Sequence, residues 1–260
     1  MKKSIIKVNN IKELNLTKLN KNISNNGFAI LSGLFDNNII DRALINLKKN
    51  FNSKLDNATV SGDYINIQKN FQKLCVGSSS LNNEPIYRLH RIIYNPIWSD
   101  DLFKLRKIFI EFCKIRNFII GKKENFCINE IENNLWSACR ILQYPLGGGH
   151  MSEHSDYILK DVSDQNNTNF LQLILLLTEK GADFKEGGAY IKVKKKFIDL
   201  EKNAKKGDIL IYQSTLKHGV KEIDPFKKLN LNKINGRVVL MNSLYQDFNS
   251  SKIKSNFYKK

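Results

Sequence analysis

The first half of the chain carries the apolar spacing of amphipathic helices. Residues 28–31 form a short apolar run that predicts a strand, and Asp36 is placed to cap the helix that follows. A second helix is expected from Ser99 to about Ile120, with two aspartates in its first turn. The apolar stripes of the two helices are Ile39, Ile40, Ala43, Leu44 and Leu47 in the first, and Leu102, Leu105, Ile108, Phe109, Phe112 and Phe118 or Ile119 in the second. Residues 1–134 are therefore expected to be mainly helical.

From residue 135 onward, short apolar runs alternate with segments rich in Gly, Asn and Lys. The runs are WSACRILQYP, FLQLILLLT, GGAYIKV, GDILIYQ and GRVVLMN, which is typical of antiparallel strands. Residues 135–250 thus predict a double-stranded β-helix, a cupin-like jelly roll, against which the N-terminal helices pack. No repeat and no linker divides the chain, so we expect one α+β domain over residues 1–260.

The composition fits a protein with a large core. With 260 residues, 42% of them hydrophobic, the chain is long enough to bury a sizeable apolar interior. The start, MKKSIIKVNN, lacks the apolar run of a signal peptide, and no segment approaches the roughly 18 apolar residues of a membrane span. We expect a cytoplasmic protein without a membrane partner.

The net charge of +17 favours acidic partners in general. The lysines, however, are spread along the whole chain together with asparagine and isoleucine. The densest runs, KVKKK at 192–196 and KKLNLNK at 227–233, are short and lack interleaved aromatic residues, as expected of a solvated hairpin or loop. A nucleic-acid partner is therefore not expected, and the sequence carries no signal for an oligomeric state.

The four cysteines argue against a stabilising framework of disulfides. Cys75, Cys113, Cys127 and Cys139 are far apart and form no C-x-x-C pair, so neither disulfides nor a cysteine-zinc site is expected. They are expected to be reduced, buried side chains.

The stretch YPLGGGHMSEHSDY, residues 144–157, contains two overlapping metal-site patterns. The letters H-M-S-E-H match the H-x-x-E-H pattern of an inverted zinc peptidase, which requires a helix to bring both histidines to one face. Three consecutive glycines, each costing about 1 kcal/mol in a helix, and the preceding Tyr-Pro pair disfavour that helix. The glutamate on a later helix that would complete such a site is also missing.

If the same segment is a strand, a different set of side chains can act as metal ligands. With a period of two, His154 and Asp156 project from the same face. The third ligand should be a histidine on a later strand, and His218, in GDILIYQSTLKHGV, is the one histidine downstream. Two histidines and one carboxylate form the facial triad of non-haem iron(II) sites.

With these residues the chain resembles the iron(II)- and 2-oxoglutarate-dependent oxygenases, especially the phytanoyl-CoA hydroxylase-like branch that acts on small molecules. The family pattern of H-x-D, a distal histidine and an arginine on the next strand is matched by His154-Ser155-Asp156, His218 and Arg237. LTEKGADFKEGGAYI also resembles the family's connection between the two ligand strands, and NNGFAILSGLF resembles its N-terminal strand and helix start. The resemblance covers most of the chain.

The resemblance implies the site and its cofactors. His154, Asp156 and His218 would hold Fe(II), and 2-oxoglutarate as cosubstrate and O₂ would take the open positions. Arg237 would pair with the distal carboxylate of 2-oxoglutarate, and Tyr144, ten residues before His154, would hydrogen-bond the cosubstrate. The implied reaction is hydroxylation of an unactivated C–H bond of a small, acidic metabolite, with release of succinate and CO₂. The carboxylate of Asp156 disfavours halogenation, whereas desaturation and cyclisation remain open.

The chain departs from the family pattern at two points. Arg237 follows His218 by 19 positions, a longer interval than usual, so residues 221–235 predict an inserted loop. Val239 replaces the hydroxyl residue that follows the family's arginine at the second position, which leaves the second contact to the distal carboxylate unassigned.

Further polar residues stand in or beside the apolar runs. Arg140, in SACRILQY, either faces the pocket and binds an acidic group of the substrate or faces outward. Gln172, within FLQLILLL, either lines the pocket or bonds to the backbone. His150 is expected near the mouth of the pocket and His90 is expected to be structural.

Three other functions remain as alternatives. A cupin-like protein that binds or senses a metal without oxygenase activity would share the jelly roll, but would not need Arg237 or Tyr144. The inverted zinc peptidase would need His150 as a ligand. Nucleic-acid demethylation is suggested by charge alone.

Overall fold

The computed structural model describes residues 4–57, 67–81, 84–157 and 171–247. The helices in these segments are α1 (Leu16–Asn26), α2 (Asn37–Asn50) and α4 (Arg106–Ile119), with 3-10 turns η2 (Ile11–Glu13) and η3 (Ser53–Leu55). The strands are β1 (Ile5–Lys7), β2 (Phe28–Ser32), β3 (Phe71–Leu81), β4 (Glu84–Tyr94), β5 (Leu135–Tyr144), β6 (Gly149–His154), β7 (Leu171–Leu176), β8 (Gly188–Val193), β9 (Lys196–Asp199), β10 (Ile209–Gln213), β11 (His218–Ile223) and β12 (Arg237–Gln246).

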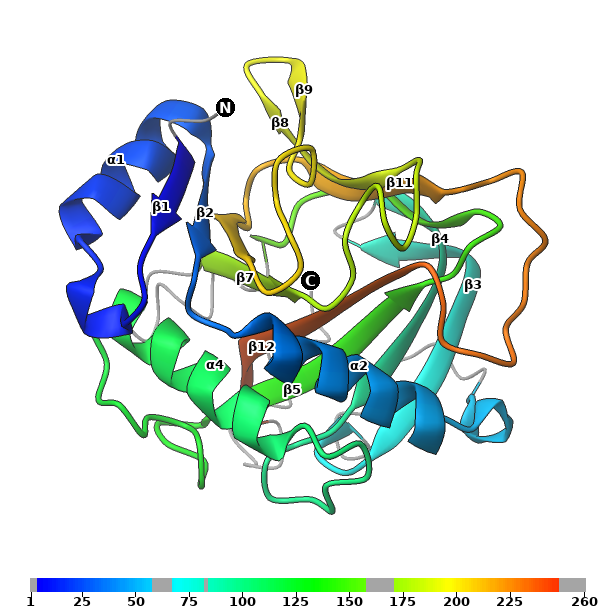
Figure 1. Cartoon of the computed structure of the whole chain (residues 1–260), viewed down its shortest axis with the longest axis horizontal. Coiled ribbons are helices and arrows are strands. Elements are labelled where there is room, and N and C mark those ends of the chain that lie inside the picture. Colours follow the sequence, from blue (N-terminus) through cyan, green and yellow to red (C-terminus); the bar gives the residue numbers. More distant parts are fainter. Residues whose placement is uncertain (1–3, 58–66, 82–83, 158–170, 248–260) are drawn as a thin grey trace.

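The described strands form one continuous sheet that folds over on itself. Their order is β1-β2-β10-β7-β12-β5-β4-β6-β11-β8-β9, with β3 paired to β4 (Figure 1). The fold-over lies at β4, which pairs with β5 near its C-terminal end and with β6 further back. This arrangement confirms the predicted jelly roll, with strands found where all five apolar runs predicted them.

The larger half of the sheet is buried on both faces. Along β7, Leu173 and Leu175 pack outward against the helices, whereas Ile174 and Leu176 pack inward between the two halves of the sheet. The same alternation holds along β5, β10 and β12. Because both faces are buried, these strands have continuous apolar sequences and not an alternation of apolar and polar residues.

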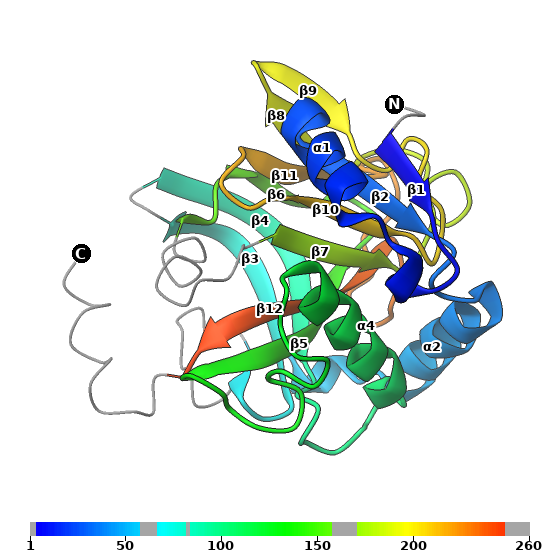
Figure 2. The same ribbon diagram turned by 90° about the vertical axis from the view of Figure 1, so that its left-hand side faces the viewer.

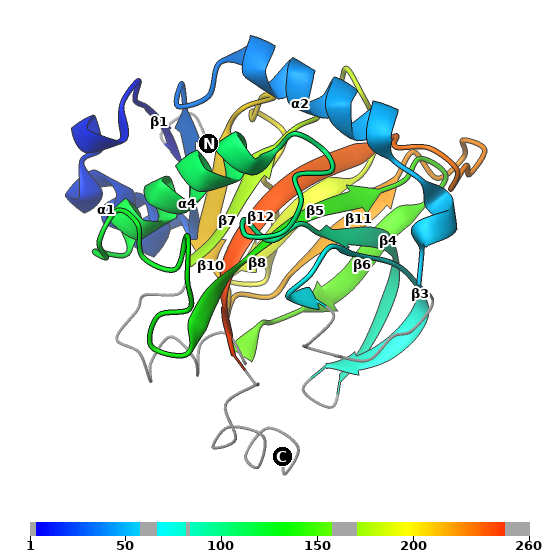
Figure 3. The same cartoon turned by 90° about the horizontal axis from the view of Figure 1, so that it is seen from below.

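Helices α2 and α4 lie side by side across the outer face, over β12 and β5 (Figure 3). The Asp36 carboxylate accepts a hydrogen bond from the Asn38 backbone N–H at 2.6 Å, so the predicted cap of α2 is confirmed. The predicted stripe of α2 is buried except for Ile39, which is 42% exposed.

The second predicted helix was placed too early, because α4 begins at Arg106 and not at Ser99. The Asp101 carboxylate accepts from the backbone N–H groups of Leu105 and Arg106 at 2.8 and 3.1 Å, so the first turn starts after this aspartate. Lys104 has a φ of +57°, which no helix passes through. The predicted end of the helix is confirmed at Gly121, whose φ is +67°.

The hairpin of β3 and β4 was missed by the sequence analysis, so the N-terminal part is not only a helical scaffold. The two strands pair along their full length and extend the sheet beyond β5. Basic residues such as Arg88 and His90 interrupt the apolar pattern of β4. Both of these side chains line the main cavity described below, which is why the strand does not read as apolar.

Several smaller expectations can be checked in the described residues. The four cysteines are free and buried, as predicted. The KVKKK run forms the turn between β8 and β9, a hairpin that projects from the rest of the fold (Figure 2). In the described part of the chain, no helix is long and apolar enough to cross a membrane.

The long connection predicted before Arg237 runs from β11 to β12 and packs against the barrel. Arg91, whose guanidinium forms a salt bridge with Asp56 at 2.6 Å, also donates to the Leu231 carbonyl at 2.8 Å. The Gln143 amide donates to the carbonyls of Lys233 and Asn235, each at 3.1 Å. These contacts anchor the inserted segment at the end of the barrel where Arg237 enters β12.

Candidate metal centre

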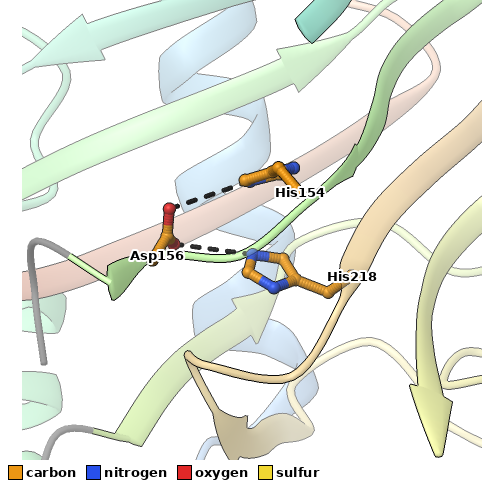
Figure 4. Close-up of side chains that lie close together, drawn as sticks. All are labelled: His154, Asp156 and His218. Atoms are coloured by element: carbon orange, nitrogen blue, oxygen red, sulfur yellow. Dashed lines mark ion pairs between the residues drawn. The ribbon is translucent and has the colours of Figure 1, made fainter. Parts of the chain in front are cut away.

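Three of the predicted site residues meet in the fold. His154 is the last residue of β6, His218 is the first of β11, and the two are directly opposed in the antiparallel register. Asp156 follows β6 by two residues, and its backbone N–H donates to the Ser214 carbonyl at 3.0 Å. The side chains point toward one another (Figure 4). The Asp156 carboxylate lies 3.8 Å from Nε2 of His154 and 3.5 Å from Nε2 of His218.

Backbone carbonyls fix the orientation of both imidazoles. Nδ1 of His154 lies 2.9 Å from the Ser152 carbonyl, and Nδ1 of His218 lies 2.8 Å from the Leu216 carbonyl. A carbonyl only accepts, so in the neutral rings Nδ1 carries the proton and Nε2 keeps a free lone pair. Both free lone pairs are on the side of Asp156. This is the second-shell arrangement by which proteins prepare histidines as metal ligands.

The surroundings of the triad shift the pKa values of two of its members. Burial lowers the pKa of His154, and the neighbouring His218 lowers it further. Burial acts to raise the pKa of Asp156, but the hydrogen bond with His218 and the nearby positive charges outweigh it, so the pKa of this carboxyl is lowered. A divalent cation requires deprotonated ligands, and both shifts favour the deprotonated forms.

The donor set fits a single iron(II) ion. One ligand atom from each of the three residues lies within 4.8 Å of the others, and among the residues described this is the one such group of His, Cys, Asp and Glu. Bonds of about 2.0–2.1 Å to one ion are compatible with that spacing after small rotations. Two imidazoles and one carboxylate leave coordination positions open, which is typical of non-haem iron(II) sites.

The zinc peptidase pattern is not formed. The segment from Gly149 to His154 is a strand, and Nδ1 of His150 lies 2.8 Å from the Gly148 carbonyl. His150 lines a separate surface depression beside Tyr190 and does not line the cavity that contains the triad. Glu153 forms an ion pair with Lys192 at 3.4 Å. His150 is therefore not part of the cavity wall, although Met151 next to it lines both the cavity and the depression.

The triad opens into a cavity of about 250 Å³ inside the barrel. Four further predicted residues line it, namely Tyr144, Arg140, Gln172 and Arg237. All four occupy the inward-facing positions of their strands, in step with Leu142 on β5, Ile174 on β7 and Val239 on β12. The structure thus brings together seven of the eight predicted site residues.

Arg237 is 1% exposed and is held by a carboxylate that the sequence analysis did not single out. Its Nε donates to Oε1 of Glu201 at 2.6 Å, and Glu201 is 3% exposed. The guanidinium lies over the ring of Tyr144, 5.1 Å from its centroid. One terminal nitrogen, Nη2, is buried and has no hydrogen-bond partner. Arg237 is thus anchored through Nε with a free donor at its tip.

Gly188 explains how Glu201 reaches this arginine. Its φ of +105° suits glycine, and a Cβ there would lie 3.0 Å from Oε2 of Glu201. The double glycine between the ligand strands therefore leaves room for the carboxylate. The pair Gly187-Gly188 was the feature of the sequence that could have indicated a side chain packed at this point.

Tyr144 and His90 stack in the wall of the cavity, with ring centroids 5.2 Å apart and planes inclined by 30°. Burial raises the pKa of Tyr144 to about 12, so its hydroxyl keeps its proton and can donate. Burial, together with the charges of Arg88 and Lys73, lowers the pKa of His90 to about 3. His90 is thus a neutral wall residue of the cavity.

Arg140 and Gln172 both line the cavity. Arg140 therefore does not face outward, and Gln172 lies beside the triad. Gln172 donates to Oδ2 of Asp156 at 2.9 Å. The Ser243 hydroxyl bridges Gln172 and Arg140. It accepts from Nη2 of Arg140 at 3.1 Å and lies 3.4 Å from the Gln172 amide oxygen. A polar chain therefore runs from Asp156 to Arg140.

Six other polar residues line the cavity without having been assigned to it from the sequence, and they include Tyr94 and Tyr245. Lys73, Arg88 and His90 come from the unpredicted hairpin, and Tyr212 comes from β10. The Tyr212 ring lies 5.1 Å from that of His218. A usable signal was present in GDILIYQ, where Tyr212 ends an apolar run six residues before His218.

Comparison with known proteins gives a likeness of structure and not of sequence. No protein-family model matches the chain, and no curated protein matches it. AviO1 from Streptomyces viridochromogenes Tue57 is similar in structure, with 13% identity, a TM-score of 0.50 and coverage of 90% of this chain and 96% of AviO1.

Two further solved structures have a similar fold. A prolyl hydroxylase from Trichoplax adhaerens, in complex with a peptide of the hypoxia inducible factor oxygen degradation domain, has 12% identity and a TM-score of 0.51, and 88% of each chain is covered. SnoN, a non-heme α-ketoglutarate-dependent epimerase from nogalamycin biosynthesis, has 9% identity and a TM-score of 0.51, with 89% of this chain and 82% of SnoN covered.

At these identities the likeness establishes the fold. The chain has the jelly-roll fold of the iron(II)- and 2-oxoglutarate-dependent oxygenases, as its sequence resemblance implied. The comparisons do not single out the phytanoyl-CoA hydroxylase-like branch, which stays a prediction.

Proposed function

We propose that the protein is an iron(II)- and 2-oxoglutarate-dependent dioxygenase that hydroxylates an unactivated C–H bond of a small acidic metabolite. Amino acids, acyl thioesters and natural-product intermediates are the candidate substrates. One observation carries the proposal. The imidazole Nε2 atoms and the carboxylate of the triad face one another in the same buried cavity as the partnerless Nη2 of Arg237. A protein that only binds or senses a metal has no use for the second feature.

His154, Asp156 and His218 would hold Fe(II) through Nε2, a carboxylate oxygen and Nε2. When bound, Fe(II) and 2-oxoglutarate supply O₂ activation coupled to decarboxylation of the cosubstrate to succinate and CO₂. Gln172 keeps Asp156 in place by donating to Oδ2. The carbonyls of Ser152 and Leu216 keep both rings in the tautomer that binds a metal.

Arg237 would bind the distal carboxylate of 2-oxoglutarate. Its planar fork of donors suits a carboxylate, and Nη2 is buried without a partner, so binding would satisfy a donor that otherwise costs stability. Glu201 fixes the arginine through Nε and acts as a positioning residue. The protonated hydroxyl of Tyr144, below the guanidinium, is available to donate to the same cosubstrate.

Apolar side chains line the cavity between its polar groups, and they include Ile92, Leu142, Ile174, Ala189, Val220, Val239 and Met241. Where these side chains shield Arg237 and the triad from water, they strengthen the charge-assisted bonds that those residues make.

Iron-dependent release of succinate from 2-oxoglutarate tests the proposal, and it can be sought before the substrate is known. The wild type should form succinate slowly without substrate, and Asp156→Ala should abolish this activity together with iron binding. Asp41→Ala, which removes a surface carboxylate paired with Lys206, is the matched control and should behave as wild type. Iron binding without any succinate would instead favour the cupin-like metal-binding protein.

The affinity for 2-oxoglutarate tests the role of Arg237. Arg237→Gln removes a charge-assisted pair worth about 1.5–3 kcal/mol, so the dissociation constant of 2-oxoglutarate should rise by about 10- to 150-fold. Anaerobic titration of the iron-loaded protein measures it. An unchanged constant would point to a different arginine, with Arg140 as the next candidate.

A further inference from the structure

The cavity carries more positive charge than the proposed cosubstrate requires. Lys73, Arg88, Arg140 and Arg237 line it, and Asp156 is the one carboxylate among the described residues of its wall. Arg237 has Glu201 behind it. The other three basic residues form no ion pair with any described residue. We call Lys73, Arg88 and Arg140 the basic cluster.

Arg140 is the most buried member of the basic cluster, at 8% exposed. Its described contacts are with neutral groups: the Ser243 hydroxyl at 3.1 Å, the sulfur of Met241 at 3.9 Å and the ring of Tyr245 at 4.9 Å. Its Nε is buried and has no hydrogen-bond partner. A buried cation with an unused donor is costly, and an anionic ligand removes that cost.

Arg140 and Arg237 stand at different places along the barrel. In the register of β5 and β12, Arg140 pairs with Met241 and Tyr144 pairs with Arg237, so the two arginines are four positions apart on the same face. Four residues of strand span about 13 Å. A cosubstrate with one end on the metal and the other on Arg237 leaves Arg140 without an anion.

Lys73 is the member of the basic cluster that approaches Arg140. Tyr94 of β4 pairs with Arg140 in the register of β4 and β5, and Lys73 lies over the Tyr94 ring, 6.0 Å from its centroid. Arg88 lies further along the cavity wall, six positions before Tyr94 on β4, where it pairs with Met151 of β6. An unused guanidinium donor and one ammonium group thus lie at the Arg140 end of the cavity.

We propose that Arg140 and Lys73 of the basic cluster form a second anion site, which binds a carboxylate or phosphate group of the substrate and so selects an anionic molecule. Arg140 is its central, specificity-determining residue. The inference rests on the proposed oxygenase function, which it deepens by assigning the residues that would bind the acidic group of the substrate. The chain Arg140–Ser243–Gln172–Asp156 connects this site to the triad, which places the substrate anion near the metal and away from the Arg237 end.

Titration of the metal-free protein with inorganic phosphate and, separately, with acetate tests the site without interference from metal coordination. Trp136 provides a fluorescence signal, because it packs edge-to-face on Tyr245 at 5.7 Å and Tyr245 lies against Arg140. Both anions should bind the wild type, and Arg140→Gln should weaken the tighter one by at least about 10-fold, as expected for a lost charge-assisted bond. Tighter phosphate binding indicates a phosphorylated substrate, and tighter acetate binding a carboxylic acid.

Two further variants serve as controls. Arg140→Lys keeps the charge and should retain part of the affinity. Arg42→Gln removes an exposed arginine on α2, outside the cavity, and should not change it. The proposal is overturned if neither anion binds the wild type, or if Arg140→Gln binds as the wild type does.

Failure of this site can be told apart from failure of the proposed function. In the iron-loaded protein without O₂, Arg140→Gln should still bind 2-oxoglutarate as the wild type does, whereas Arg237→Gln should bind it about 10- to 150-fold more weakly. Anion binding through Arg140 in a protein that does not bind 2-oxoglutarate would refute the oxygenase and keep the site. Binding of 2-oxoglutarate without Arg140-dependent anion binding would refute the site alone.

Discussion

The two faces of β7 are formed by alternating residues of one strand, but they have different roles. Leu173 and Leu175 pack outward against the helices, and this outer face is apolar throughout. On the inner face Gln172 shares the surface with Ile174 and bonds to Asp156. The neighbouring strands repeat the contrast, since Arg140, Tyr212 and Arg237 all face inward. Polar residues on the inner face thus mark the cavity, whereas Gln143 and Asn242, on the outer face of β5 and β12, bond to main-chain carbonyls of the segments that cover the sheet.

The difference is also one of free energy. The outer face gains stability from every apolar contact, by about 25 cal/mol per Å² of surface removed from water. On the inner face, Nε of Arg140 and Nη2 of Arg237 are buried without partners, and each such group costs about 1–3 kcal/mol. The outer face therefore raises the free energy of unfolding. The unpaired donors of the inner face lower it, and a bound ligand would remove that cost.

The largest expected effect is on the outer face. Leu173→Ala removes a side chain that is 3% exposed, and the free energy of unfolding should fall by about 2–5 kcal/mol because of lost burial and the cavity left behind. The iron(II) affinity of the folded protein should stay unchanged. Urea denaturation and anaerobic iron titration measure the two quantities. Ile45→Ala, at a position that is 62% exposed, is the control, and a parallel loss of iron affinity in Leu173→Ala would break the comparison.

The adjacent residue should respond in the opposite way. Gln172→Leu keeps the volume but removes the donor to Asp156, so iron(II) affinity should fall by about 10- to 100-fold, as is typical when a partner of a metal ligand is lost. The free energy of unfolding should change by less than about 1.5 kcal/mol. If Gln172→Leu destabilises the fold as much as Leu173→Ala does and leaves iron binding intact, the two faces do not differ in role.

A smaller effect should appear as a dependence on pH. The pKa of His90 is lowered to about 3 by burial, from 6.5, so the unfolded chain binds a proton that the folded protein excludes. Stability from this group is complete above pH 6.5 and is lost as the pH falls toward 3. Between pH 6 and pH 5 the metal-free wild type should lose about 1 kcal/mol more than His90→Phe, which keeps a ring against Tyr144. Equal pH profiles of unfolding would show that His90 is not buried as the structure has it.

The sequence predicted the parts of the fold that follow a regular period. The jelly-roll strands were found because they are buried on both faces, and the triad was found because His154 and Asp156 share one face of an extended segment. His154 and His218 are paired directly across β6 and β11. This pairing depends on the register of two strands that are distant in sequence, so it could not be predicted from the sequence.

The parts that were missed depend on tertiary contacts. The β3–β4 hairpin was overlooked because basic side chains that face the cavity disrupt its apolar pattern. Glu201 was not found because its partnership with Arg237 joins residues 36 positions apart in sequence. The exact surface that His150 lines could not be read from the sequence, because the pairing of the short strand from Gly149 carries register irregularities that no periodicity shows.

Binding of iron(II) to two histidine variants tests the central claim most directly. His154 and His150 share one short strand, yet His154 lies in the triad and His150 lines a different surface. Under anaerobic conditions, His150→Ala should bind one iron(II) and 2-oxoglutarate as the wild type does, and His154→Ala should lose the iron site. Loss of the metal in His150→Ala with retention in His154→Ala would contradict the assignment of the metal centre.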